Sequence, residues 1–89
     1  MKNKELTGKI IGASFIVHNI LGYGFLEKVY KNALAFELKK NNLNVEIEYP
    51  IKVKYQNQVV GEYFADLFVE KQIIVEIKAV KELRQVHEV

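Results

Sequence analysis

The first forty residues place apolar side chains at helical spacing. Between residues 6 and 21 these positions recur every three or four residues, which predicts an amphipathic helix with Thr7 as its N-cap. Gly22 and Gly24 interrupt the pattern, and a second helix is expected from about residue 25 to residue 40. The side chains expected on the buried faces are Leu6, Ile10, Ala13, Val17 and Ile20 in the first helix and Leu26, Val29, Ala33, Phe36 and Leu38 in the second.

From residue 45 onward the apolar period changes to two. Residues 45–55 alternate apolar and polar positions, which predicts a half-buried strand. Pro50 cannot donate to a ladder, so this strand is expected at a sheet edge or with a bulge. Two further strands are expected at 59–69 and 73–79, and the second of these is almost wholly apolar, as in a strand covered on both faces. The residues after 79 resemble the opening turns of another helix.

These elements together predict an α+β domain. It has two N-terminal helices, a three-stranded antiparallel meander and a short C-terminal helix. A chain of 89 residues holds one domain with a thin core, so its stability is expected to depend in part on a partner subunit.

Composition excludes several other classes of protein. The chain has no cysteine, which excludes a disulfide framework and a thiolate metal site. Its net charge of +2 permits nucleic-acid binding without arguing for it. Polar residues interrupt every apolar stretch, and no signal-peptide pattern follows the N-terminus. We therefore expect a cytoplasmic protein that does not associate with membranes.

Three charged residues carry the candidate chemistry. Glu76 and Lys78 stand two apart in the apolar third strand, so both point to one face. If Val69 pairs with Ile73 across the turn, Asp66 faces Glu76 with Cβ atoms about 5 Å apart. A divalent cation such as Mg²⁺ would remove the repulsion between the two carboxylates. A lysine beside it can orient or deprotonate a water and offset charge on phosphorus, so the pattern predicts a phosphodiester hydrolysis site.

A plain cross-strand ion cluster explains the same three residues. Acidic residues near a Glu-x-Lys triplet are common in charged sequences, so spacing alone leaves both interpretations open. Two other residues are candidate substrate contacts. Tyr30, one helical turn after Glu27, has packing as its alternative role, and His87 has a surface role as its alternative. Glu27 itself lies in the first turn of the second helix, where a carboxylate favours the helix dipole.

Several short motifs occur in one order along nearly the whole chain. The motifs are Leu6-Thr7-Gly8, Val17-His18, Leu21-Gly22, Gly24 with Glu27 and Tyr30, Ala65-Asp66-Leu67, Val75-Glu76-Ile77-Lys78-Ala79 and Val86-His87-Glu88. In that order they resemble the GxxExxY family, a group of small prokaryotic proteins placed in the PD-(D/E)xK nuclease superfamily. Tyr23 stands where the family's turn usually has proline.

The resemblance implies a restriction-endonuclease-like core and a metal site. It implies Asp66 and Glu76 as metal ligands, Lys78 as the catalytic lysine and Glu27 as an additional metal-binding carboxylate. Members usually continue past the His-Glu pair with a helix and a final strand. The single domain at residues 1–89 is therefore expected to be incomplete, with an uncovered sheet that favours homo-oligomers.

Two functions are expected from these observations. The first is a deoxyribonuclease that uses Mg²⁺ or Mn²⁺ to hydrolyse DNA phosphodiester bonds, or an inactive or truncated member of such a group. The second is a non-catalytic interaction module or homodimer built on the same scaffold, because a fold does not determine a function.

Overall fold

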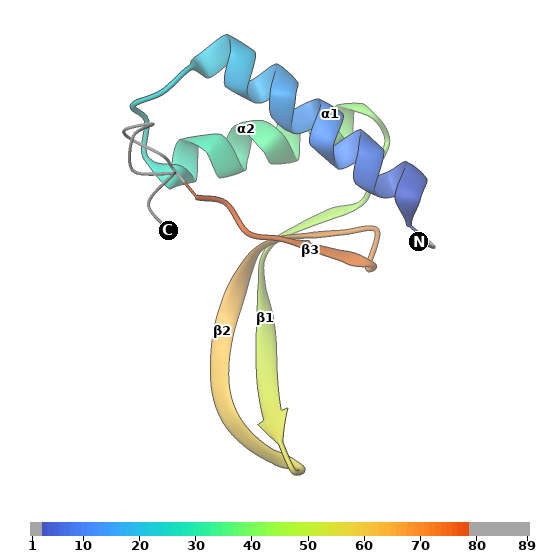
Figure 1. Ribbon diagram of the computed structural model, residues 1–89, viewed down its shortest axis with the longest axis vertical. Helices are drawn as coiled ribbons and strands as arrows, with labels where there is room; N and C mark the ends of the chain where they lie inside the picture. Colours follow the sequence, from blue (N-terminus) through green and yellow to red (C-terminus); the bar gives the residue numbers. More distant parts are fainter. Residues whose placement is uncertain (1–2, 79–89) are drawn as a thin grey trace, which may run out of the picture.

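The computed structural model describes residues 3–78 as two helices followed by a three-stranded sheet (Figure 1). This arrangement confirms the expected α+β class, the two N-terminal helices and the antiparallel meander. The expected C-terminal helix and His87 lie outside the described residues. The elements are α1 (Lys4–Leu21), α2 (Glu27–Lys40), β1 (Val45–Tyr55), β2 (Gln58–Val69) and β3 (Ile73–Val75).

The strand order is β1-β2-β3, with β2 in the centre. Because β1 is an edge strand, Pro50 lies where a missing amide donor is tolerated, as the sequence predicted. The turn between β1 and β2 has positive φ at Gln56 and Asn57, and the β2–β3 turn has positive φ at Glu70 and Lys71. Within residues 3–78, no helix has the length and apolarity needed to cross a membrane.

Helix α1 buries most of the stripe predicted for it. Ile10, Ala13 and Val17 are buried, whereas Ile20 is exposed. The predicted N-cap was wrong, because the helix begins one turn earlier, with Asn3 at the cap. The amide of Thr7 donates to the carbonyl oxygen of Asn3, which places Thr7 inside the helix.

The buried face predicted for α2 was largely wrong. Leu38 is fully buried as expected, but Phe36 is 65% exposed and Leu26 is 75% exposed. The helix carries two apolar stripes, and periodicity alone cannot tell which of them meets the sheet. The side chains that α2 buries are Lys31, Leu34, Ala35 and Leu38.

Strand β3 is shorter than predicted. It ends at Val75 rather than at residue 79, and Ile74 is 43% exposed, so the strand is not covered on both faces. The backbone ladder with β2 stops after the pair Leu67 and Val75. After Val75, the segment is linked to β2 through a side chain instead of the backbone. The carboxylate of Asp66 accepts a hydrogen bond from the amide of Ile77.

The core occupies one end of the sheet. Leu67 and Val69 of β2 are fully buried and pack with the buried residues of both helices. The remainder of the β1–β2 hairpin, residues 51–64, extends away from the helices as a two-stranded ribbon (Figure 1). We call this segment the outer ribbon. Its exposed large apolar side chains are Val53, Tyr55, Val59, Val60, Tyr63 and Phe64.

Candidate functional site

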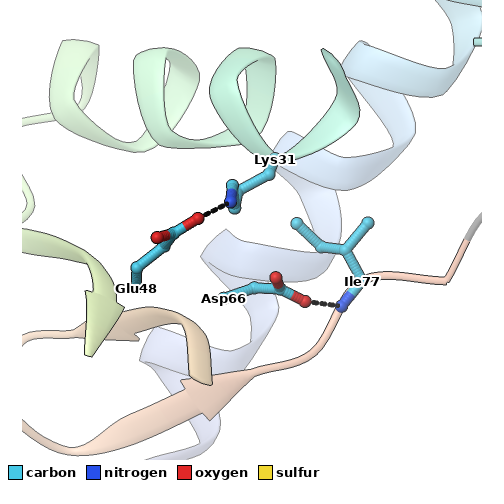
Figure 2. A network of polar contacts seen from close by, with 4 residues as sticks. All are labelled: Lys31, Glu48, Asp66 and Ile77. Atoms are coloured by element: carbon cyan, nitrogen blue, oxygen red, sulfur yellow. Dashed lines mark hydrogen bonds and ion pairs between the residues drawn. The ribbon is translucent and has the colours of Figure 1, made fainter. Parts of the chain in front are cut away.

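Asp66 lies in β2 at the border between the core and the outer ribbon. Its neighbours Ala65 and Leu67 are fully buried, while Asp66 itself is half-buried. Its Oδ2 atom accepts a hydrogen bond from the amide of Ile77 at 2.8 Å (Figure 2). That bond ties the segment after β3 back to the central strand.

Glu76 follows directly after the last residue of β3. The predicted pairing of Val69 with Ile73 is confirmed, and the ladder runs to Leu67 and Val75. One further step in the same register would bring Glu76 opposite Asp66, but the backbone ladder ends before that step, and the next link to β2 is the bond from the amide of Ile77 to Asp66. We call Asp66 and Glu76 the acidic corner.

Lys78 lies two residues beyond Glu76 in the same extended segment. Both side chains are exposed, whereas Ile77 between them is half-buried and packs against the core. This alternation is typical of an extended chain with one face on the protein and the other in water. Glu76 and Lys78 are therefore accessible to solvent ligands.

Glu48 of β1 lies across from Asp66 on the other side. The flanking pairs are Ile47 with Leu67 and Tyr49 with Ala65, which leaves Glu48 and Asp66 as the positions between them. Glu48 has a φ of 56°, in the left-handed region, so it breaks the regular pleat of the strand. The sequence analysis missed this residue, because Glu48 falls on a polar position of a regular alternation.

Lys31 of α2 is the partner of Glu48. Its Nζ atom lies 2.6 Å from the Oε2 atom of Glu48 (Figure 2). Lys31 is 8% exposed, and it is the only polar or charged residue buried within residues 3–78. A buried ammonium group requires a partner of opposite charge. The Glu48 side chain is 60% exposed, so the pair lies at the edge of the core rather than inside it.

The sequence does carry a signal for Lys31. Lys31, Leu34, Ala35 and Leu38 follow the i, i+3, i+4, i+7 spacing of a helix face, and all four are buried. A lysine at the head of an apolar stripe indicates a buried cation with a carboxylate partner elsewhere. That partner cannot be identified from the helix alone.

Glu27 and Tyr30 lie near the start of α2. Glu27 is exposed and precedes Lys31 by four residues, so the two share a helix face. The Tyr30 hydroxyl donates to the carbonyl oxygen of Gly22 at 2.5 Å and accepts from the amide of Phe25 at 3.4 Å. These bonds hold the connection between α1 and α2, which supports the packing role of Tyr30. Its role as a substrate contact stays a prediction.

The donor chemistry of the acidic corner suits a hard divalent cation. Mg²⁺ is commonly held through one or two carboxylates, with water and substrate phosphate completing its shell, and Mn²⁺ also prefers oxygen ligands. Asp66 and Glu76 supply such oxygens. Within residues 3–78, no three His, Cys, Asp or Glu side chains lie close enough together to hold a metal ion. The metal roles of Asp66, Glu76 and Glu27, and the catalytic role of Lys78, therefore stay predictions.

Comparison with known proteins places the chain in a family. A family model described as the PD-(D/E)XK nuclease superfamily matches residues 4–89, which is nearly the whole chain. No curated protein and no solved structure shows significant similarity to it.

Proposed function

The chain belongs to the PD-(D/E)XK nuclease superfamily, and on that premise we propose that it is a metal-dependent nuclease-like protein that hydrolyses DNA phosphodiester bonds. Within the superfamily we assign it to the GxxExxY group, on the motifs described above. The observation that carries the proposal is the bond from the Ile77 amide to Asp66, because it holds Glu76 and Lys78 next to the central strand. We further propose a cytoplasmic location, which suits a chain without cysteine.

The proposed site residues divide the chemistry among them. Asp66 and Glu76 would hold Mg²⁺ or Mn²⁺, with Glu27 as an additional carboxylate. When bound, such a cation polarises a phosphoryl oxygen and activates a water. Lys78 orients the attacking water and offsets the negative charge that develops on the phosphoryl oxygens. Tyr30 and His87 are proposed to contact the DNA substrate.

Calorimetry with Mn²⁺ tests the metal site without requiring turnover. We expect saturable binding to the wild-type chain, and an affinity at least about tenfold weaker in Asp66→Asn and in Glu76→Gln, because each variant removes one charged ligand. Glu62→Gln is the matched control. Glu62 is an exposed carboxylate of the same strand, on the outer ribbon, and it pairs with Lys52. Equal binding in all four folded proteins would contradict the proposal.

A cleavage assay then tests the role of Lys78. Lys78→Ala is expected to bind Mn²⁺ as tightly as the wild type while losing DNA cleavage, because the lysine acts on water and phosphate rather than on the cation. Lys54→Ala on the outer ribbon removes a lysine of equal charge and is expected to keep cleavage. Cleavage that survives in Lys78→Ala would exclude a catalytic role for this lysine.

The outer ribbon favours a second function, that of an interaction module that binds another copy of this chain. An isolated two-stranded ribbon is only marginally stable in water, and contiguous exposed apolar side chains are typical of interfaces. Strand β1 also leaves an open edge, which two copies can share in an antiparallel arrangement about a two-fold axis.

Sedimentation of two phenylalanine variants tests this second function. Phe64 of the outer ribbon is 66% exposed and Phe36 of α2 is 65% exposed, so the two differ in place and not in exposure. We expect wild-type dimers, and a dissociation constant about tenfold higher in Phe64→Ser, because an aromatic contact is lost from the interface. Phe36→Ser is expected to dimerise like the wild type. A monomeric wild type, or a loss confined to Phe36→Ser, would contradict the ribbon interface.

A further inference from the structure

We propose that the ammonium group of Lys31 competes with the divalent cation for the carboxylates of the acidic corner. In this proposal Glu48 is a further metal-binding carboxylate, and its ion pair with Lys31 keeps it from the cation. The proposal rests on the metal site described under the proposed function. Lys31 and Glu48 do not belong to the residue set that the family resemblance implied.

The first support is the burial of Lys31. The Lys31 residue is 8% exposed and its side chain 10%, and its Nζ atom lies 2.6 Å from Oε2 of Glu48. Because the Glu48 side chain is 60% exposed, solvent screens the pair at that end, and the pair is weak evidence for a purely stabilising role. A pair of this kind next to a candidate metal site is suited to controlling charge there.

The second support is the backbone of Glu48. A φ of 56° in the interior of a strand costs free energy for a side chain other than glycine. A local break of this kind re-aims the side chain of the residue that carries it. Glu48 therefore points to Lys31 of α2, although its position in the sheet is across from Asp66.

The consequence is electrostatic. Without a metal, the positive charge of Lys31 offsets the repulsion between Glu48 and Asp66, which occupy opposed positions on adjacent strands. A divalent cation at the acidic corner is repelled by the same ammonium group, and Glu48 remains bound to Lys31. Charges a few ångströms apart at a partly buried site interact strongly enough to change an affinity by about tenfold. Lys31 thus weakens cation binding, and its removal frees Glu48 to act as a ligand.

Mn²⁺ calorimetry on the full chain tests this competition. Lys31→Met is expected to bind Mn²⁺ about tenfold more tightly than the wild type. Lys40→Met is the matched control, because it removes the same charge from α2 at a position where the side chain is 61% exposed and lies 3.6 Å from Glu37. Its affinity is expected to stay within about twofold of the wild type, since exposed charges are well screened.

Two further variants keep the test decisive. Lys31→Gln removes the charge but retains a polar side chain, so it serves if Lys31→Met does not fold. It is also expected to bind Mn²⁺ more tightly than the wild type, because a neutral amide holds Glu48 less strongly than an ammonium group does. Adding Glu48→Gln to Lys31→Gln is expected to cancel that gain, because the freed ligand is lost. A merely structural ion pair would not produce tighter metal binding when it is broken.

Each outcome decides between the claims. Tighter binding in the Lys31 variants that depends on Glu48 supports the proposal. Unchanged or weaker binding in those variants, with normal binding in the wild type, overturns it and leaves the proposed function standing. An absence of Mn²⁺ binding in every variant overturns both.

Discussion

The two halves of β2 have similar strand pairing but opposite environments. In the inner half, Ala65, Leu67 and Val69 are fully buried, whereas in the outer half Val59, Val60 and Phe64 are exposed. Both halves pair with β1 in an antiparallel ladder. The difference is that α1 and α2 cover only the inner half, as Figure 1 shows. The strand pattern therefore predicts pairing, and the packing of the helices determines burial.

The acidic corner and Lys31 lie at the border between these two halves. Asp66 is the half-buried residue between two fully buried ones, and Glu76 and Lys78 next to it are exposed. Partial burial strengthens electrostatic interactions, while exposure lets water and phosphate enter. A site at this border has both properties, which neither the core nor the outer ribbon offers alone.

The largest expected effect separates the core from the outer ribbon. Val69→Ala is expected to lower the free energy of unfolding by about 2 kcal/mol, because it removes buried methyl groups and leaves a cavity. Val59→Ala, the same change in the same strand at a residue that is 49% exposed, is expected to cost less than about 0.5 kcal/mol. Urea denaturation measures both values. Similar losses of unfolding free energy in the two variants would show that Val59 is buried in solution, and hence that another surface covers the outer ribbon.

The next largest effect concerns the hydrogen bond between Ile77 and Asp66, at the border between the two halves of β2. Asp66→Ala removes the acceptor of the Ile77 amide, and a hydrogen bond to a charged group contributes about 1.5 kcal/mol. Hydrogen exchange of the Ile77 amide is therefore expected to accelerate by about tenfold. Glu62→Ala on the outer ribbon should leave that amide unchanged. An amide of Ile77 that exchanges freely in the wild type would exclude the bond.

The smallest effect distinguishes a packing tyrosine from a surface tyrosine. Tyr30→Phe loses the bonds of the hydroxyl to Gly22 and Phe25, and is expected to cost about 1 kcal/mol of unfolding free energy. Tyr55→Phe on the outer ribbon, where the side chain is 64% exposed, is expected to be close to neutral. Thermal unfolding of both variants measures the difference. If Tyr30→Phe is neutral in stability but weakens DNA binding, the substrate-contact role is favoured instead.

The sequence predicted the positions of the helices and strands better than it predicted which of their faces are buried. The two helices and the first two strands were found because their apolar periods are regular over eleven or more residues. The buried face of α2 was mistaken because Leu26, Val29 and Phe36 form one apolar stripe and Leu34 and Leu38 belong to another. Only the packing of the helix on the sheet selects between them.

The candidate site was predicted in part for a similar reason. Asp66, Glu76 and Lys78 were predicted from spacing and from a hairpin register that the structure confirms as far as Leu67 and Val75, and their roles stay predictions. The pair of Lys31 with Glu48 could not be found in this way, because its residues are seventeen positions apart. The left-handed backbone of Glu48 is also a local exception to the strand pattern.

Paramagnetic broadening by Mn²⁺ tests the central claim most directly, that the border between the two halves is the metal site. In the ¹⁵N-labelled chain, substoichiometric Mn²⁺ is expected to broaden the amide resonances of Asp66, Glu76, Ile77 and Lys78 first. The amides of Gln56 and Asn57, in the turn of the outer ribbon, are expected to stay sharp at the same Mn²⁺ concentration. Broadening that begins at the ribbon turn, or that is uniform along the chain, would contradict a metal site at the acidic corner.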